Sequence, residues 1–375
     1  MDHNNALLTA LLIKKWNRRL AAIGLVAFAA WTVDAVSSMK DREKVDKMTE
    51  KMQTVCVGRF LIDLPDASPV SFRSAFIQGI DISTYDGESE QEFLIRLAKE
   101  EAAINAKPND VGTKNMESVT EIKREGLIGK IFVFGRNSTY GFHGEEKITL
   151  TGVAISGYIH ADGVSFDFTA SDYDPAKIGN LPKLIDQLRP LAKGEIPSEP
   201  GFCFDRGIIR DPLVAAQRER VTISAHFQGH PDVTLGFDTA AGLNPGSSLL
   251  TRDANNSVKK MFFFLFKKLR AGERAINGIP GEELLERVRE SNLAVVYGFQ
   301  WESLSNPDNV FLPEISLEFD TGLNPNQGGK PVQSSFSEAA TMAMWDKISS
   351  SLRVRPTVVP KVDETLPPPM PLPRT

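Results

Sequence analysis

Apolar and polar residues follow two different periods along the chain, and each period predicts one kind of element. Residues 72–83 and 220–237 alternate and are rich in β-branched and aromatic side chains, so we predict strands there. From 90 to 105, apolar residues recur at helical spacing behind Ser89, a residue type that favours helix N-caps. Residues 255–270 have a second stripe of this kind, so we predict a helix over each segment. The second stripe consists of Val258, Met261, Phe262, Leu265, Phe266 and Leu269.

The same patterns continue through both halves of the chain. Further strands are predicted at 130–134, 147–158, 164–169, 293–301 and 313–319. Apolar, helix-like stretches at 181–189 and 339–353 each run into a Leu-Arg pair. We therefore predict the α+β class: two tandem, similar modules, each an antiparallel sheet with two helices on one face.

Short matches repeat in the same order in the two halves, which favours a duplication. Cys56, Arg59, Ile62 and Pro65 recur at the same offsets as Cys203, Arg206, Ile209 and Pro212. The other matches pair 77–79 with 227–229, 126–129 with 278–281, 140–143 with 297–300, and the two Leu-Arg endings.

The first 40 residues differ from the rest and predict export. Four basic residues (Lys14, Lys15, Arg18 and Arg19) precede an uncharged apolar run of 14 residues at 20–33. That length suits a signal peptide and falls short of the roughly 17–25 residues of a spanning helix. A short uncleaved anchor in the inner membrane is the alternative. We expect a periplasmic protein, either anchored or released.

These features divide the chain into four parts. Residues 1–40 are the signal or anchor segment, 41–192 the first module and 202–356 the second, with a linker at 193–201. Residues 357–375 form a proline-rich tail, which should be extended and exposed.

The net charge argues against one class of partner, and the cysteine content suggests one disulfide. The chain has 43 basic and 48 acidic residues, a net charge of −5, so nucleic acid is not an expected partner. Its two cysteines, Cys56 and Cys203, open the two modules at equivalent positions. Because the cell envelope is oxidising, a disulfide between them is our candidate, and two buried thiols are the alternative.

Candidate chemistry is sparse. His226 and His230 lie four apart but in a strand followed by a turn, which does not suit a metal pair, and His143 beside two glutamates lies in a turn without a nucleophile. Asp320-Thr321-Gly322 matches the aspartic-protease signature, but that mechanism needs two such loops, and the other copy reads Asp238-Thr239-Ala240. We expect no catalytic residues, no metal and no cofactor.

The aromatic run 261–266 has two interpretations. Lys259 and Lys260 precede it and Lys267 and Lys268 follow it, as in a membrane-touching helix. Its helical stripe also fits a core helix. We favour core packing, with a partner-binding or membrane face as the alternative.

The stretches 55–65, 201–203, 278–283 and 299–302 resemble the type VI secretion lipase immunity proteins, which are paired with α/β-hydrolase phospholipase effectors. The resemblance covers about residues 50–356 and brings no catalytic residues with it. It implies a periplasmic protein that binds and inhibits a cognate lipase. From the duplication we add the hypothesis that a cleft between the two lobes clamps the lid of the lipase or its active-site entrance. An envelope enzyme with an atypical site and a structural envelope protein are the alternatives.

Loops at the ends of strands are the expected contacts with the effector. The candidate contacts are Asp86 and Glu88 in one loop, Asn244 in a second, and Asn306 in a third with Trp301 as an aromatic anchor nearby.

Overall fold

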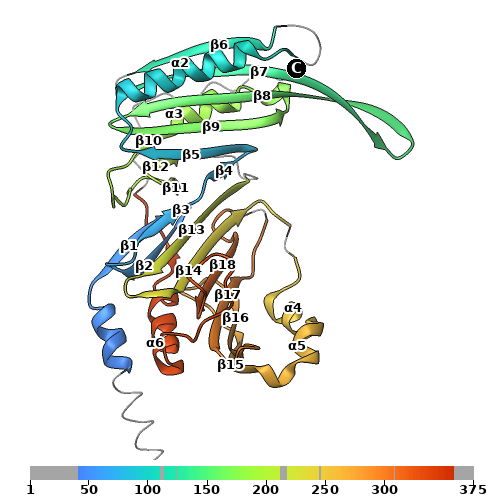
Figure 1. Cartoon of the computed structure of the whole chain (residues 1–375). Coiled ribbons are helices and arrows are strands. Elements are labelled where there is room, and N and C mark those ends of the chain that lie inside the picture. Colours follow the sequence, from blue (N-terminus) through green and yellow to red (C-terminus); the bar gives the residue numbers. More distant parts are fainter. Residues whose placement is uncertain are drawn as a thin grey trace, which may run out of the picture.

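The computed structural model describes residues 41–109, 114–124, 126–211, 218–244, 246–307 and 309–358, which form two lobes (Figure 1). The predicted signal or anchor segment at 1–40 and the tail from 359 to 375 lie outside these ranges. None of the helices within the described ranges is long and apolar enough to cross a membrane.

One antiparallel sheet, built from 13 of the described strands, runs through both halves. The first half supplies β3 (Val70–Phe72), β4 (Ala75–Ile77), β5 (Ile80–Asp86), β6 (Met116–Arg124), β7 (Leu127–His143), β8 (Glu146–Ala161) and β9 (Val164–Tyr173). The second half supplies β13 (Glu219–Phe227), β14 (His230–Ala241), β15 (Phe266–Glu273), β16 (Gly281–Arg289), β17 (Val295–Ser303) and β18 (Glu314–Thr321).

The two halves meet where β4 pairs with β13, with Ile77 opposite Glu219 and Phe76 opposite Arg220. From this junction the strand order is β4-β5-β9-β8-β7-β6 in one direction and β13-β14-β18-β17-β16-β15 in the other. The prediction of a separate sheet in each module was therefore wrong. The physical reason is that the backbone groups of an edge strand need partners, and each half provides them for the other.

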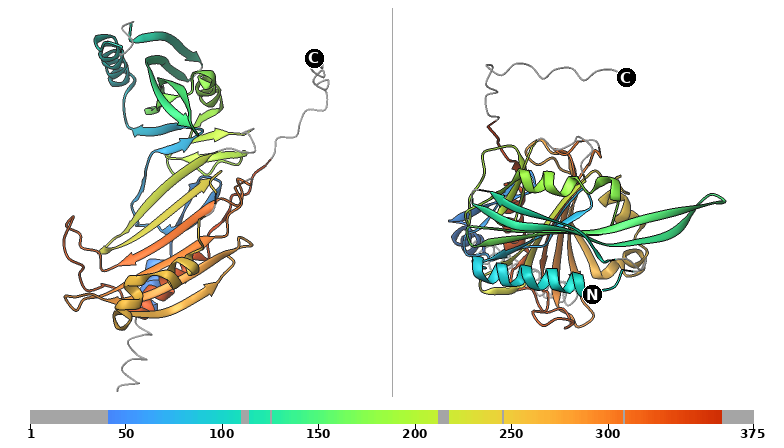
Figure 2. Two further views of the ribbon diagram at one scale, coloured as in Figure 1. Left: turned by 90° about the vertical axis from the view of Figure 1, so that its right-hand side faces the viewer. Right: turned by 90° about the horizontal axis from the view of Figure 1, so that it is seen from above.

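The helices of the first half lie on opposite faces of the sheet, which corrects the prediction of two helices on one face (Figure 2). Helix α2 (Glu90–Ala106) packs Phe93 and Leu97 against Phe132 and Tyr158. Helix α3 (Asn180–Gln187) packs on Gly157, which directly precedes Tyr158 in β8. A Cβ on Gly157 would lie 3.0 Å from the Ile185 Cδ1 atom. Successive residues of a strand point to opposite faces. A 3-10 turn, η1 (Pro175–Lys177), precedes α3.

The second half repeats this arrangement. In helix α6 (Glu338–Ser349), the Trp345 Nε1 atom donates to Glu283 on β16. In α4 (Leu249–Asn255), the backbone N–H of Leu250 donates to Glu282, the preceding residue of the same strand. Helices α4 and α6 therefore lie on opposite faces.

The predicted helix at 255–270 was wrong. That segment is divided among the end of α4, a short helix α5 (Ser257–Met261), a 3-10 turn η2 (Phe263–Leu265) and strand β15. Asn256 has extended backbone angles and caps α5, so the chain restarts there. Beyond the turn the chain is extended, and β15 pairs with β16.

Two small sheets tie the halves together. The hairpin of β1 (Met52–Val57) and β2 (Phe60–Pro65) is extended by β19 (Arg353–Val354), from the end of the second half. The hairpin of β11 (Gly201–Phe204) and β12 (Gly207–Arg210) is extended by β10 (Leu188–Pro190), from the end of the first half. Each hairpin thus receives its third strand from the other half.

The segments predicted from alternation at 72–83 and 220–237 are extended but each divides at a turn, the first between β4 and β5 and the second between β13 and β14. Three other predictions are confirmed. Those at 130–134, 147–158 and 164–169 lie within β7, β8 and β9. The predictions at 293–301 and 313–319 fall on β17 and β18, whereas β6 and β16 were missed. Strands β7 and β8 continue past the sheet as a projecting arm, defined here as residues 137–151 (Figure 1).

Candidate functional site

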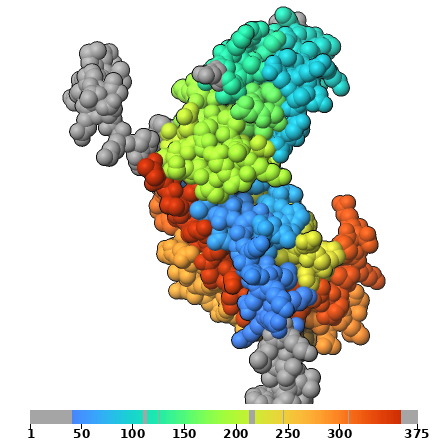
Figure 3. All heavy atoms as spheres, turned by 90° about the vertical axis from the view of Figure 1, so that its left-hand side faces the viewer, coloured from blue at the N-terminus to red at the C-terminus, as the bar shows by residue number. Residues whose placement is uncertain are grey.

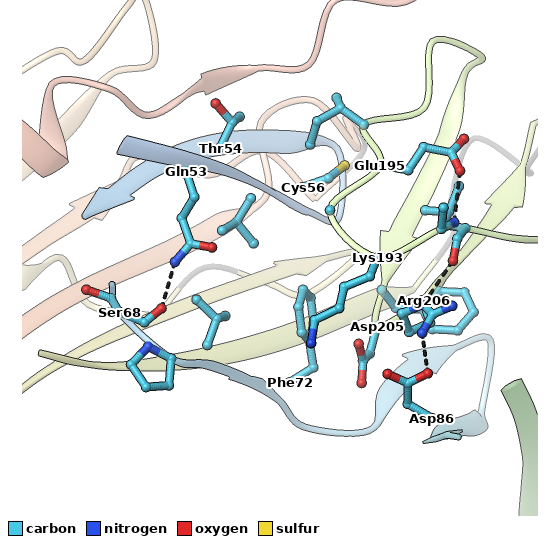
Figure 4. A pocket seen from close by; sticks show the side chains of 18 of the residues that line it. Gln53, Thr54, Cys56, Ser68, Phe72, Asp86, Lys193, Glu195, Asp205 and Arg206 are labelled. Atoms are coloured by element: carbon cyan, nitrogen blue, oxygen red, sulfur yellow. Dashed lines mark hydrogen bonds and ion pairs between the residues drawn. The ribbon is translucent and has the colours of Figure 1, made fainter. Parts of the chain in front are cut away.

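A cleft of about 620 Å³ lies where the two halves meet (Figure 4). One wall comes from β1 and residues 66–70 of the first half, and another from the linking segment 191–196. Residues 204–206, at the turn after β11, complete it from the second half. The space-filling view shows the blue residues of the first hairpin directly against the yellow-green residues near 200 (Figure 3). The cleft is therefore shared by both halves.

Acidic side chains outnumber basic ones around this cleft. Asp66, Asp86, Glu195 and Asp205 face Lys193 and Arg206 among the lining residues. Burial raises the pKa of the Asp205 carboxyl, and the nearby charge of Asp86 raises it further. Arg206 forms an ion pair with Asp86 and donates from its Nε atom to the Leu191 carbonyl, at 3.0 Å. A binding segment with basic side chains suits this lining.

The two halves are fixed to each other beside the cleft. A disulfide joins Cys56 on β1 to Cys203 on β11, with 5.9 Å between their Cα atoms. Gly58 and Cys203 exchange two backbone hydrogen bonds of 2.9 and 2.8 Å. Gly58 has a φ of +60°, and a Cβ there would lie 2.9 Å from the Cγ2 atom of Thr239. Glycine is the residue that allows this close approach.

A buried ion pair also crosses between the halves. The Arg59 Nε atom lies 2.7 Å from the Glu219 Oε1 atom, and both side chains are 4% exposed. Two further hydrogen bonds from Arg59, of 3.1 and 3.2 Å, reach the carboxylate of Asp211. With its guanidinium paired on both sides, Arg59 holds the turn after β1 to the start of β13.

Of the predicted effector contacts in the first loop, one is available to a partner. Asp86 ends β5, lines the cleft and remains about half exposed despite its pairing with Arg206. Glu88 is engaged elsewhere, because its carboxylate accepts two hydrogen bonds from Arg96, at 2.8 and 2.9 Å. Those bonds lower the pKa of Glu88.

The structure brings the second and third predicted loops together. Asn244 follows β14 and Asn306 follows β17, and both residues are exposed. Residues 246–248 of one loop and 303–305 of the other line a common depression of about 150 Å³. Arg252 bridges the same region by an ion pair to Glu302 at 2.5 Å. This loop patch lies on the side of α4, away from β1 and the cleft (Figure 1).

Trp301 does not serve as an exposed anchor. Its side chain is 0% exposed, and its Nε1 atom donates to the Arg274 carbonyl at 2.8 Å. It lies on the face of β17 that includes Phe299, which packs against Trp345 of α6. The prediction was wrong because the alternation of a strand does not reveal which of its faces is covered by a helix.

The motifs weighed for catalysis are separated in space. Strands β14 and β18 are antiparallel, so Asp238 lies opposite Ser316 while Asp320 lies opposite Thr234. The two aspartates cannot share a proton as a protease pair does. His230 bonds to Ser335 at 2.7 Å and packs on Phe336, whereas His226 is exposed. Within the described ranges, no group of three or more His, Cys, Asp or Glu side chains could hold a metal.

Two exposed apolar surfaces differ from the favoured predictions. The aromatic run after Lys260 does not pack in the core as predicted: Met261 is 70%, Phe263 73% and Phe264 70% exposed. The projecting arm exposes Tyr140 and Phe142 to similar extents. The sequence predicted a cleft between the lobes and a contact at Asp86, which lines it, but gave no sign that Arg206 lines it as well.

The comparisons with known proteins agree with this fold. Family models for the N-terminal and C-terminal domains of "Tle cognate immunity protein 4" match residues 53–179 and 195–357. A search of curated proteins finds no matching relative.

Two solved structures show the same fold at low sequence identity. One contains the immunity protein TplEi of the type VI secretion system of Pseudomonas aeruginosa with an "L" peptide, at 23% identity and a TM-score of 0.64, covering 82% of this chain and 99% of that one. The other is the Tle4–Tli4 complex, at 23% identity and a TM-score of 0.66, covering 82% and 98%.

The two family models together span most of the chain, including the β1 wall of the cleft and residues 204–206. The chain therefore belongs to the Tle cognate immunity protein 4 family, a family of immunity proteins and not of enzymes.

Proposed function

We propose that this chain inhibits its phospholipase effector by holding a protruding segment of that enzyme, such as the lid over its active site, in the cleft between the two halves. The observation that carries the proposal is a cleft whose lining comes from both halves and from the segment that links them. A loop held between two walls loses the freedom that lid opening requires. Holding the lid closed would keep lipid from the active site.

The construction of the cleft supports such a grip. The disulfide, the paired backbone of Gly58 and Cys203, and the ion pair of Arg59 with Glu219 all fix the two halves beside it. A preorganised site loses less entropy on binding than a mobile one. The acidic lining favours a lid segment with lysine or arginine. A relative of the same fold was solved with a bound peptide, which supports recognition of a single segment.

Survival of cells tests the inhibition itself. We expect cells that export the effector to the periplasm to die without this chain and to survive when it is co-expressed, with a complex that survives purification. An effector lacking its nucleophile is the control for toxicity, and it should still bind. Equal death with and without this chain, together with no isolable complex, contradicts the proposal.

Blocking the cleft tests the mechanism separately. Ala192 lines the cleft and is exposed, so Ala192→Trp should fill the space without disturbing the core. We expect the affinity for the effector to fall at least about tenfold, equivalent to about 1.4 kcal/mol. Ala103→Trp, the same change at an exposed position of α2, is the matched control. Equal affinities of the two variants would remove the cleft from the mechanism while leaving inhibition intact.

We also propose that the chain acts in the periplasm, attached to the inner membrane through residues 1–40 or released from it. The basic cluster and the apolar run of that segment support this location, as does the periplasmic role of the family. A reporter that is active only in the cytoplasm, fused after residue 356, should be silent. A strong reporter signal would contradict export.

A duplication is the proposed origin of the two lobes, with modules at 41–192 and 202–356 and a separate tail at 357–375. The support is the identical order of corresponding strands on the two sides of the β4–β13 junction, and the exchange of β10 and β19 between hairpins. An experimental structure should allow the halves to be superposed with their strands in register. A superposition that matches only isolated hairpins would contradict the duplication.

A further inference from the structure

An exposed aromatic cluster lies at one end of the molecule, on α5 and η2. We define it by Val258, Met261, Phe262, Phe263 and Phe264, whose exposure ranges from 41% for Phe262 to 73% for Phe263. The rings contact one another: the centroid of Phe264 lies 5.9 Å from that of Phe263 and 6.5 Å from that of Phe262. A contiguous apolar surface of this kind marks an interaction site on a soluble domain.

The charged residues that flank the aromatic cluster in sequence are all basic. Lys259, Lys260, Lys267 and Lys268 flank it, and the sequence has no acidic residue between Ala254 and Gly272. Lys259 is held by Asp253 and Glu286, and Lys268 by Asp253. Lys260 and Lys267 are exposed, and Lys267 lies 3.3 Å from Glu338. Aromatic side chains beside lysines are typical of segments that lie in the interface of an anionic bilayer.

The aromatic cluster lies at the end of the molecule where the described chain begins. Lys267, at the start of β15, pairs with Glu338 at the start of α6, and the neighbouring Ser337 hydroxyl donates to the Asp41 carboxylate. Figure 1 shows α5, the start of α6 and the first helical turns after residue 41 at the same lower end. The 40 residues before Asp41 contain the basic cluster and the apolar run that predict membrane contact. The aromatic cluster and the start of the described chain at Asp41 therefore lie at the same end of the molecule.

We propose that the aromatic cluster inserts into the surface of an anionic phospholipid bilayer, with the surrounding lysines on the headgroups. This contact, together with the segment before residue 41, orients the folded part on the membrane. The cleft and the first lobe then face away from the lipid. The proposal does not depend on effector binding, so a test with vesicles alone separates it from the proposed function.

Site-specific fluorescence in the full chain tests the contact. Phe263→Trp and Phe142→Trp each add one tryptophan at an exposed phenylalanine, the first in the aromatic cluster and the second on the arm. Each variant is reconstituted in vesicles of phosphatidylglycerol and phosphatidylcholine with brominated acyl chains, and the signal of the parent chain is subtracted. We expect the tryptophan at 263 to be quenched about threefold more than that at 142, because an interfacial segment reaches the acyl boundary.

The charge requirement is tested in the same assay. Adding Lys260→Glu and Lys267→Glu to Phe263→Trp should reduce the quenching, and replacing phosphatidylglycerol by phosphatidylcholine should do the same. Circular dichroism and effector binding report whether the variants remain folded. Equal quenching at 263 and 142 would overturn the proposal. So would a shift in emission at 263 on adding the effector when vesicles produce none, because the aromatic cluster would then be a protein contact.

Discussion

At the scale of single residues, the contact between the two halves includes a buried ion pair. Arg59 and Glu219 are 160 positions apart in sequence, and both are almost fully buried. A buried ion pair contributes little over an apolar pair, but removal of one partner leaves an uncompensated charge. Arg59 retains the more exposed Asp211 as a second partner. The pair therefore matters for holding β13 against the first hairpin more than for total stability.

We expect Glu219→Gln to lower the free energy of unfolding by about 3 kcal/mol, since the Arg59 guanidinium would lose its closest charge partner. Urea unfolding followed by circular dichroism measures this change. Asp186→Asn breaks the exposed pair with Arg124 and is the matched control, with an expected loss below about 1 kcal/mol. If the two variants lose a similar free energy of unfolding, burial of the ion pair does not determine how much stability its removal takes away.

Asp320 makes stability depend on pH. Burial raises the pKa of its carboxyl to about 6, and the charge of Glu318 contributes. The unfolded carboxyl titrates near pH 4, so the folded state holds the proton more tightly. The free energy of unfolding should therefore fall as pH rises from about 4 to 6 and level off above.

Asp320→Asn should flatten this part of the pH profile, because the amide has no proton to lose. At pH 7 the variant should be more stable by up to about 3 kcal/mol. Denaturant unfolding at several pH values measures both effects, with the parent chain measured alongside. An unchanged slope between pH 4 and 6 would assign the pH dependence to other groups.

The sequence could identify important residues here but not their partners. Arg59 and Arg206 stood out because they repeat at equal offsets. In the fold, Arg59 pairs with Glu219 and Arg206 with Asp86, both distant in sequence. Only the tertiary arrangement brings these carboxylates within reach, so no local pattern could predict the pairs.

At the scale of elements, local signals decided which predictions held. Helix α2 was predictable because Ser89 and Glu92 form a complete capping box ahead of an amphipathic run. The segment at 255–270 had a helical stripe of similar quality. Its last residues instead begin a strand at Phe266, because pairing with β16 satisfies the backbone of β15. Pairing between distant strands therefore outweighed the helical spacing of the apolar residues.

The arm is an element with little support. Its residues pair only between β7 and β8, beyond the last pairs with β6 and β9 at Phe134 and Val153. A two-stranded hairpin without a packed face is marginally stable. We expect amides at 137–151 to exchange with deuterium much faster than those at 128–134 of the same strand, measured by mass spectrometry. Equal protection would indicate that the arm is held by another surface.

The disulfide joins β1 to β11 over 147 positions of sequence, so it restrains the unfolded chain strongly. We expect the double change Cys56→Ala and Cys203→Ala to lower the free energy of unfolding by about 4 kcal/mol. A reducing agent should lower the stability of the parent chain by a similar amount and leave the variant unchanged. An effect of the reducing agent on the variant would show that it acts at another site.

At the scale of the whole molecule, the duplication pattern was visible in the sequence but its consequence was not. Matching motifs predicted two similar halves, and each half does use the same strand order. The pairing that merges the two sheets is short: β13 pairs with Phe76 and Ile77 of β4 and with the three residues of β3. Pairing between edge strands depends on the relative position of the two lobes, and no sequence motif predicts that position. The cleft that both lobes line depends on it as well.

The last prediction concerns the loop patch around Asn244 and Asn306. The two loops come from different strands but share one depression, so a partner that covers one should touch the other. We propose them as effector contacts in addition to the cleft. Asn244→Arg and Asn306→Arg should each lower the affinity for the effector about tenfold, because each places a long charged side chain in the interface. Surface plasmon resonance with immobilised effector measures the affinities.

Asn105→Arg, the same change at an exposed position on α2, is the matched control and should bind as the parent chain does. Because β1, one wall of the cleft, and α4, beside the loop patch, lie on opposite sides of the lower lobe in Figure 1, an effector that contacts both must wrap around that lobe. The two sets of variants then distinguish the arrangements. Loss of affinity in both sets indicates an enclosing contact, whereas loss with Ala192→Trp alone restricts the effector to the cleft and removes the loop patch from the interface.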